Sequence, residues 1–350
     1  MCSELLVATP DVHIRRSSNG PDNWTAERLA TRRDYRLCKE AVAILVLADM
    51  PISRQDLLCE SERDLGLPLP LASLLLDQLL AAGLLCSELT PLSKRWVDLT
   101  ASWSKFGWEE SARYFLSTFD SEFAQGDDEG RHEAALRMRR YSSEEPDTLR
   151  FKQFANAKWS KPLPQPTSIV LAKELSSTLI EQVVSIAFAQ TCAVPIAWSA
   201  IPLEARTSPS GGCRHPTEGY LYVLDLPGLP KGCYHINSKG PSLDLLFDEP
   251  ESLAGLDRGL VALVGRVPFT PRAIVIFSTV FEKNMYRYRE DRTFRTVHMD
   301  VGHLIATIEC VAREAGQQTF VQYSLDDGAI EQAIGLNFLV EGIQGALAIG

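Results

Sequence analysis

The chain has 350 residues, 45% of them apolar, and a formal net charge of −10. This length allows two domains with sizeable cores, and the acidic balance excludes a protein that coats nucleic acid, because such a protein needs a basic face. None of the eight cysteines forms a C-x-x-C pair, which argues against a zinc ribbon, and no apolar run is long enough to predict a membrane span.

Residues 1–30 are predicted to form an irregular arm, because they contain the turn-rich run SSNGPDN. The opening run MCSELLVATPDVHIRR lacks the long apolar segment of a signal peptide. Together with cysteines scattered through apolar segments, this favours a cytoplasmic protein with reduced thiols.

Residues 31–125 are predicted to form a winged-helix-like domain. A helical pattern runs from Tyr35 to a stop at Met50, and Ser53 suits the N-cap of a second helix. A third helix is expected over residues 69–82, and a strand pair with a turn at Thr90 would supply the wing. The third helix contains no Lys or Arg, so peptide binding or a structural role is favoured over DNA binding.

Aromatic residues are dense over residues 101–125, where their spacing of three or four favours a buried helix face over a stacking platform. Residues 126–167 are charged at first and then rich in proline, which predicts a solvated linker containing at most one helix.

Residues 168–350 are predicted to form an α+β sandwich. Apolar residues at helical spacing follow Lys173, and the runs GYLYVLDL, GCYHIN and RAIVIFSTV read as strands. A second amphipathic helix is expected from Asp300 to a C-terminal glycine at 316. Strand, helix and strand then complete the domain.

The run RTSPSGG stands between this first helix and the first strand. Gly211 and Gly212 carry no Cβ, so a flat ligand could approach the main chain closely. Ser208 and Ser210 offer hydrogen-bonding groups, and Arg206 offers a cation. An ordinary turn with no ligand explains the same residues equally well.

A second run, MYRYREDRTFRTVHMDVGH, places arginines among aromatic side chains directly before a helix. Such a pattern indicates a solvated strand or cation–π stacking, but the start of a helix also attracts anions. His303 in this run is either a structural hydrogen-bonding residue or part of a site. No group of His, Cys and carboxylate residues has the spacing of a metal site.

The two runs together resemble the nitroreductase-like flavoproteins and, within them, the SagB-type dehydrogenases, which oxidise azolines to azoles in ribosomally made peptides. The matching segments are residues 206–220, residues 234–235 and residues 288–303, and the resemblance covers about the last half of the chain. It implies a nitroreductase-like FMN-binding sandwich and a homodimer that holds FMN at its interface.

The resemblance also assigns residues to the site. It implies that Ser210, Gly211 and Gly212 line the flavin ring and that Arg206 lies near it. Ser208, Arg292 and His303 complete the expected cofactor-binding set. Arg287 and Tyr288 stand where azoline oxidases carry a Lys-Tyr pair, which makes them the expected catalytic residues. The expected partners are a ribosomal precursor peptide, both leader and core, and other maturation enzymes.

The sequence departs from the family pattern at two places. Arg287 replaces the lysine and cannot act as a base, because a guanidinium stays charged, so Tyr288 would need a pKa lowered by a neighbouring cation. The R-R-S element that usually precedes the first helix and binds the FMN phosphate is missing. Lys173 or an arginine between Arg287 and Arg295 is the expected substitute.

These departures keep other functions open. A flavin-free relative could act as a scaffold or peptide-binding subunit of a maturation complex. A general nitro- or quinone reductase that consumes NAD(P)H is a third hypothesis. The first hypothesis, an FMN-dependent oxidoreductase that modifies a ribosomally synthesised peptide by a two-electron oxidation of a backbone heterocycle or a side chain, accounts for the largest number of motifs.

Overall fold

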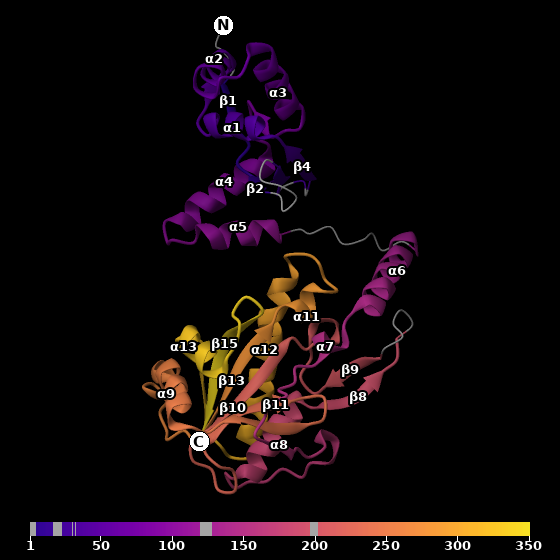
Figure 1. Ribbon diagram of the computed structural model, residues 1–350, viewed down its shortest axis with the longest axis vertical. Helices are drawn as coiled ribbons and strands as arrows, with labels where there is room; N and C mark the ends of the chain where they lie inside the picture. Colours follow the sequence, from indigo (N-terminus) through magenta and orange to yellow (C-terminus); the bar gives the residue numbers. More distant parts are fainter. Residues whose placement is uncertain (1–4, 17–22, 30, 32, 120–127, 197–201) are drawn as a thin grey trace. The chain divides into compact units, whose positions relative to one another are not determined.

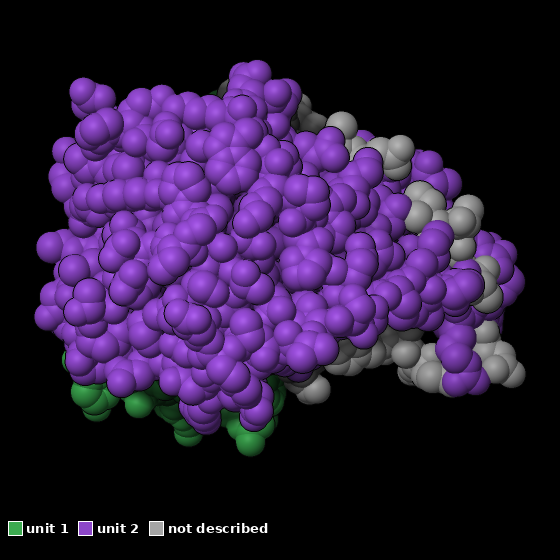
Figure 2. All heavy atoms as spheres, turned by 90° about the horizontal axis from the view of Figure 1, so that it is seen from below, with its two compact units in different colours: residues 1–121 green, residues 122–350 purple. Residues whose placement is uncertain are grey.

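The structure is a computed structural model that describes residues 5–16, 23–29, 31, 33–119, 128–196 and 202–350. The chain divides into two compact units, residues 1–121 and residues 122–350 (Figure 2). The α+β class is confirmed, because both units combine helices with antiparallel sheets. The boundary expected between residues 125 and 126 lies outside the described residues.

Unit 1 has two small antiparallel sheets, with strand orders β5-β1-β6 and β2-β3-β4. Its strands are β1 (Leu5–Ala8), β2 (Val12–Arg16), β3 (Trp24–Arg28), β4 (Arg33–Leu37), β5 (Ile52–Ser53) and β6 (Leu85–Cys86). Its helices are α1 (Lys39–Leu47), α2 (Arg54–Leu65), α3 (Leu69–Ala81), α4 (Pro91–Ser104) and α5 (Glu109–Ser117).

Residues 1–30 do not form the irregular arm that we expected, because β1, β2 and β3 lie within them. Strands β2 and β3 pair antiparallel, and Ala26 of β3 is fully buried in the core of unit 1. The turn-rich composition of SSNGPDN hid the short strands that end at Arg16 and begin at Trp24.

The helix boundaries in unit 1 follow local capping. The Ser53 Oγ accepts a hydrogen bond from the Asp56 N–H at 3.1 Å and caps α2, as predicted. The expected wing at Thr90 is wrong. Thr90 instead caps α4 by accepting from the Ser93 N–H at 3.1 Å, and Pro91 occupies the first position of that helix.

The aromatic residues of α4 and α5 contact one another, but they are less buried than we expected. The ring centroids of Trp103 and Phe115 lie 5.6 Å apart, and those of Trp103 and Trp108 lie 5.8 Å apart. Trp108 is 58% exposed and Phe106 is 79% exposed. Spacing alone located the contacts between the rings, but it could not determine their exposure.

Unit 2 is built on a seven-stranded antiparallel sheet with the order β14-β15-β13-β10-β11-β12-β7 (Figure 1). The strands are β7 (Trp159–Pro162), β10 (Thr217–Val223), β11 (Gly232–Asn237), β12 (Ser242–Phe247), β13 (Ala273–Val280), β14 (Thr319–Gln322) and β15 (Glu341–Ile349). Strands β8 (Gln190–Val194) and β9 (Leu203–Arg206) pair separately.

The helices of unit 2 cover both faces of this sheet (Figure 1). Leu221 and Val223 of β10 pack with residues of α8 (Ser177–Phe188) and α12 (Thr293–Glu314). Tyr220 and Tyr222 point to the other face, where α9 (Pro250–Gly259) and α13 (Asp327–Ile334) lie. Alternation along the strand places neighbours on opposite faces, so β10 is buried throughout.

The second half of the expected linker belongs to the body of unit 2. Residues 126–167 include α6 (Asp128–Glu144), α7 (Asp147–Arg150), β7 and the start of the short 3-10 helix η1 (Pro166–Ser168). Glu145 is 7% exposed, and Leu163 packs in the core. Strand β7 is an edge strand, where proline is tolerated, so a proline-rich sequence did not exclude a strand.

Among the described residues, no helix combines the length and apolarity that crossing a membrane requires. The seven described cysteines are free thiols.

Candidate functional site

The turn at residues 210–212 is bonded to helix α12. The Asp300 carboxylate accepts a hydrogen bond from the Ser210 hydroxyl at 2.6 Å and another from the Gly211 N–H at 3.1 Å. The Ser210 Oγ in turn accepts from the His215 N–H at 2.9 Å. One carboxylate of α12 therefore fixes the turn that leads from β9 into β10.

Both glycines of the turn are required by close contacts within the chain. A Cβ on Gly211 would lie 2.2 Å from Cγ2 of Thr296, and a Cβ on Gly212 would lie 2.0 Å from the Tyr288 hydroxyl oxygen. Gly212 also has a φ of +60°, which favours glycine. The faces of the glycines that we expected to meet a flat ligand are thus in contact with α12 and the segment before it.

The backbone after Gly212 is strained. Cys213 has a φ of +52° and His215 a φ of +47°, although both carry a Cβ. Such residues persist where the surrounding contacts enforce them, and they cluster at functional sites. The His215 Nε2 donates to the Glu204 carbonyl oxygen at 2.7 Å. Burial, followed by the charge of Arg206, lowers the pKa of His215 to about 3, so this imidazole is neutral.

Tyr288 does not have the lowered pKa that a role as base requires. Burial raises its pKa, and the charges of Arg214 and Arg287, which act in the opposite direction, do not compensate. The role of Tyr288 as a base depended on a neighbouring cation that lowers its pKa. Both cations are present, but the effect of burial on the pKa of Tyr288 is larger. Tyr288 therefore keeps its proton at neutral pH.

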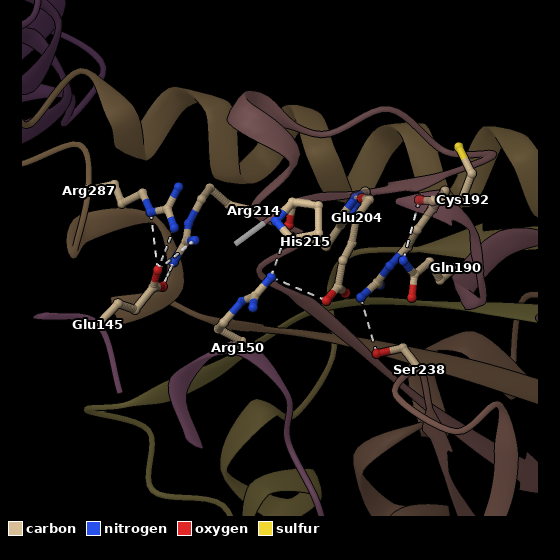
Figure 3. Close-up of polar contacts among 11 residues, drawn as sticks. Glu145, Arg150, Gln190, Cys192, Glu204, Arg214, His215, Ser238 and Arg287 are labelled. Carbon is tan, nitrogen blue, oxygen red and sulfur yellow. Dashed lines mark hydrogen bonds and ion pairs between the residues drawn. The ribbon is translucent and has the colours of Figure 1, made fainter. Parts of the chain in front are cut away.

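Arg287 is held by a carboxylate that the sequence analysis did not identify. Glu145, directly after α6, accepts hydrogen bonds from Arg287 at 2.7 and 3.1 Å and from Arg214 (Figure 3). All three side chains are nearly inaccessible to water. Burial raises the pKa of Glu145, but the hydrogen bonds and charges of the two arginines lower it by more. The pKa is therefore below its ordinary value, and the carboxylate is ionised.

The remaining expected residues lie around the turn. The Ser208 hydroxyl is buried, and it bonds the Thr307 hydroxyl of α12 at 2.9 Å and the Ala187 carbonyl of α8 at 3.3 Å. The His303 Nδ1 lies 3.1 Å from the Pro209 carbonyl oxygen. Both side chains therefore tie α12 to the segment before the turn, while Arg292 directly precedes α12.

Lys173 lies elsewhere. Its ammonium group donates to the Glu314 carbonyl oxygen at 2.5 Å and pairs with the Glu314 carboxylate at 3.2 Å. Glu314 ends α12, whereas Asp300 of the same helix bonds the turn. Fourteen residues of α-helix separate them, about 20 Å at 1.5 Å per residue. Lys173 is therefore remote from the turn.

A basic hollow, which we call the arginine pocket, lies beside the turn. Six of its lining residues are Arg150, Glu204, Arg206, Arg214, His215 and Arg287. Figure 3 shows the contacts of this region, in which Arg150 approaches Glu204 at 3.3 Å. The pKa of Glu204 is raised by its burial, although Arg150 and Arg206 oppose this.

Arg206 is the least satisfied cation of the pocket. Its Nη2 donates to the Ser238 hydroxyl at 3.1 Å. Its Nε is buried, and it has no hydrogen-bond partner among the described residues. Buried donors are nearly always paired in proteins, so this nitrogen is a candidate contact for a ligand.

A second hollow is a groove of about 300 Å³, and some of its lining residues stand close to Arg287 and Tyr288 in the sequence. Its apolar lining comes from α11 (Glu282–Met285), from Phe281 just before that helix, and from Leu339 and Val340 before β15. Tyr286 and Arg289 also line it.

Comparison with known proteins identifies the second unit. A model of the nitroreductase family matches residues 170–350. The chain belongs to the nitroreductase family. The trifolitoxin-processing protein TfxB of Rhizobium leguminosarum bv. trifolii is 30% identical over 181 residues, which cover 51% of this chain and 48% of TfxB. A protein of Methanocaldococcus jannaschii assigned by name to the nitroreductases is 29% identical over 129 residues, 37% of this chain and 63% of that protein.

The chain therefore spans less than two thirds of the length of either relative. Among solved structures, the E. coli microcin synthetase McbBCD complex with truncated pro-MccB17 bound is 16% identical, with a TM-score of 0.42. That similarity covers 75% of this chain and 97% of the other. The match to the family model confirms the family expected from the sequence motifs.

Sequence reasoning missed the two residues that organise the site of this nitroreductase-family domain. Glu145 stands 142 positions before Arg287 in a charged segment, and nothing in that segment distinguishes its carboxylate from the others. Thr296, which covers Gly211, looks like any helix residue. Only the packing of α12 on the turn gives either residue its role.

Proposed function

We propose that this protein is an FMN-dependent oxidoreductase that modifies a ribosomally synthesised peptide. Membership of the nitroreductase family supports the oxidoreductase class. The relationship to a protein named for trifolitoxin processing supports a peptide as the substrate. The expected reaction is a two-electron oxidation of a backbone heterocycle or a side chain, and flavin supplies such chemistry when it is bound.

The observation that carries the cofactor proposal is the arginine pocket with its unpaired Arg206 Nε. FMN ends in a phosphate, and guanidinium groups match phosphate geometry well. The pocket adjoins the turn at residues 211–212, because it is lined by Cys213, Arg214 and His215. The lining therefore supplies positive charge for an anionic group, although the hollow, at about 20 Å³, has room for about one water molecule.

The chain's own groups then have defined tasks. Glu145 fixes the Arg287 guanidinium, so Arg287 supplies a positive charge at one position instead of a mobile cation. Tyr288 holds its proton on Oη next to Gly212 and serves as a hydrogen-bond donor to a group that reaches the turn. Asp300 holds the turn against α12 by accepting hydrogen bonds from Ser210 and Gly211.

Unit 1 is proposed to dock the leader of the precursor peptide or a partner enzyme. Its sheet β2-β3-β4 has β4 at one edge, and an extended peptide can add to such an edge through main-chain hydrogen bonds. The exposed residues Arg33 and Arg36 of β4 would favour an acidic peptide. The winged-helix-like character of this unit and a homodimer of the whole chain remain part of the proposal.

A flavin-free scaffold is the second candidate. It is favoured by the contacts of the turn: the Ser210 hydroxyl and the Gly211 N–H already donate to Asp300, and Thr296 and Tyr288 cover the glycines. A protein with this arrangement could bind a peptide without any redox chemistry.

Two measurements separate the candidates. The purified protein is mixed with FMN, passed through a desalting column and examined for the visible absorption of oxidised flavin. A protein that retains flavin in stoichiometric amount supports the enzyme, and a colourless protein supports the scaffold. A candidate precursor peptide is then incubated with the flavin-loaded protein and weighed by mass spectrometry. Loss of two hydrogens supports oxidation, and an unchanged mass for every candidate peptide contradicts it.

A further inference from the structure

The groove lined by α11 is large enough for a ligand that the arginine pocket cannot hold. Its volume is about 300 Å³, against about 20 Å³ for the arginine pocket. Ligand pockets in proteins begin at about 300 Å³, whereas a hollow of 20 Å³ holds about one water molecule. The groove therefore has room for a large side chain of a ligand.

The apolar side chains of the groove are open to solvent. Met285 is 55% exposed, Leu339 is 75% exposed and Val340 is 47% exposed, and all three line the groove. Single exposed apolar side chains are ordinary on a protein surface, but a group of them around a hollow indicates a binding surface. An occupant that removes these side chains from water must itself present an apolar group.

A fixed cation stands at one end of the segment that lines the groove. The Arg289 Cζ lies 4.0 Å from the ring centroid of Tyr141 and 5.5 Å from that of Tyr286. The Arg289 Nε also donates to the Tyr286 carbonyl oxygen at 3.1 Å. These contacts hold the guanidinium in place, and no carboxylate of the described residues lies within ion-pair distance of it. Arg289 therefore offers a positive charge to a carboxylate of a ligand.

A carboxylate stands at the other end of the same segment. Glu282 begins α11, lines the groove and pairs with no cation of the described part of the chain. The Tyr286 N–H donates to the Glu282 carbonyl, and the Tyr288 N–H donates to that of Asn284, so the backbone towards Arg289 is largely helical. At about 1.5 Å per helical residue and at most about 3.6 Å per extended one, Glu282 and Arg289 lie roughly 10 to 15 Å apart.

The groove is close to the expected catalytic residues. Tyr286 lines the groove, and Tyr288 follows two residues later, so their Cα atoms are at most about 7 Å apart. A peptide that fills the groove would have its neighbouring residues near Tyr288, which keeps its proton at neutral pH. This position favours the substrate peptide as the occupant.

We propose that the groove binds a segment of the substrate peptide in which a large apolar side chain stands between a basic and an acidic residue. The acidic residue pairs with Arg289 and the basic residue pairs with Glu282. An extended peptide rises about 3.3 Å per residue, so long charged side chains on either side of one apolar residue reach both ends. The inference rests on the proposed function, because it gives the sequence preference of the proposed peptide substrate.

Methionine methyl groups report binding in the groove directly. The chain has five methionines, of which Met285 lines the groove, whereas Met299 is 61% exposed on α12 outside it. Full-length protein with isotope-labelled methionine methyl groups is titrated with the blocked tripeptide Lys-Phe-Asp and followed by NMR. The Met285 resonance, assigned with Met285→Leu, should shift to saturation, and the Met299 resonance should stay in place.

Three changes in the tripeptide test the preference. Lys-Ala-Asp should bind at least about tenfold more weakly, because it lacks the apolar ring that the groove buries. Lys-Phe-Asn and Gln-Phe-Asp should each bind about twofold to fivefold more weakly, as expected for the loss of one exposed ion pair.

Variants of the groove have matched controls. Arg289→Gln should make Lys-Phe-Asp and Lys-Phe-Asn bind equally, whereas Arg258→Gln, at an exposed arginine of α9 outside the groove, should change nothing. Leu339→Asn should weaken Lys-Phe-Asp about fivefold, whereas Val170→Asn, at a side chain that is 88% exposed outside the groove, should not. All four side chains are exposed, and an unchanged Met299 resonance checks that each variant is folded.

Several results would overturn the inference. They are no binding of Lys-Phe-Asp, equal affinities for the four tripeptides, or an Arg289→Gln variant that still prefers Asp to Asn. A Met285 resonance that moves with protein concentration, and not with the tripeptide, identifies a second copy of the chain as the occupant and also overturns it.

The proposed function fails in a different way. Flavin retention and the loss of two hydrogens from a precursor peptide test that function, and neither enters the tripeptide titration. A protein that shows the tripeptide preference but retains no flavin keeps the groove assignment and contradicts the FMN-dependent function. A flavin-loaded enzyme that oxidises its peptide but lacks the preference contradicts the groove assignment alone.

Discussion

The hydroxyl oxygen of Tyr288 lies 2.0 Å from the point where a Cβ on Gly212 would stand. Tyr288, in the segment before α12, thus leaves no room for a side chain at position 212, in the turn before β10. Since both residues belong to the candidate site, their contact links the stability of the turn to its chemistry.

Gly212→Ala should destabilise the protein by about 2–4 kcal/mol, because it adds a strained backbone to an overpacked contact. Gly316→Ala is the matched control: its φ is +79°, but nothing lies within 4 Å of the added Cβ. The control should cost only the backbone strain, about 1–2 kcal/mol. Urea unfolding measures both values, and equal losses would show that Tyr288 does not restrict the turn.

Gly211→Ala should be destabilising for a different reason, the contact of its Cβ with Cγ2 of Thr296 at 2.2 Å. Thr296→Ser removes that methyl group and keeps the hydroxyl. The double variant should therefore recover at least about 1 kcal/mol relative to the sum of the single changes. Additive free energies of unfolding would contradict the contact.

Glu145→Gln should cost about 3–5 kcal/mol, because it leaves Arg214 and Arg287 buried without their counter-charge. Glu314→Gln, at a carboxylate that is 77% exposed, should change the free energy of unfolding by less than about 1 kcal/mol. Similar losses in the two variants would argue against a structural ion cluster at Glu145.

The same carboxylate predicts a pH dependence. The folded state lowers the pKa of Glu145, so its contribution to stability is fully present above the unfolded pKa of about 4.5 and is lost as the pH falls towards the folded pKa. Wild type should therefore lose stability more steeply than Glu145→Gln as the pH falls below about 4.5. Chemical unfolding at pH 7, 4 and 3.5 measures the two slopes, which should differ in this acid range.

His215 predicts a second dependence at higher pH. Its folded pKa of about 3 lies below the ordinary value of 6.5, so its contribution is present above pH 6.5 and is lost as the pH falls towards 3. NMR should show the His215 ring unprotonated at pH 5, with resonances assigned by comparison with His215→Asn, because Asn tolerates a positive φ. A ring that titrates near pH 6.5 would show that the site is open to water.

Tyr288→Phe should keep flavin binding and slow turnover about tenfold to hundredfold, because it removes the hydroxyl proton that the site holds. The raised pKa predicts that the rate of wild type does not rise through a deprotonation of Tyr288 between pH 7 and 9. A rising step in that range which disappears in Tyr288→Phe would identify Tyr288 as a base after all. Flavin content, measured by absorbance, controls for loss of cofactor.

The sequence by itself determined much of unit 2. Short strand-like runs located β10 and β11, a fully apolar run located β13, and helical spacing located α8 and α12, because the patterns of these elements must match their burial. The motifs around Gly211 and Asp300 identified the family. The strands within residues 1–30 and β7 were missed, because short strands beside Gly and Pro leave little periodic signal.

Only the tertiary structure decided how the candidate site is organised. Periodicity is a local signal, whereas Glu145, Arg214 and Arg287 meet across 142 positions of sequence through the packing of unit 2. Burial depends on the whole unit as well, so the balance between desolvation and neighbouring charge that keeps Tyr288 protonated was not readable from its neighbours in the chain. A pattern of residue types can thus indicate which side chains belong to a site. The protonation state of each side chain and its contacts depend on the residues that the fold packs around it.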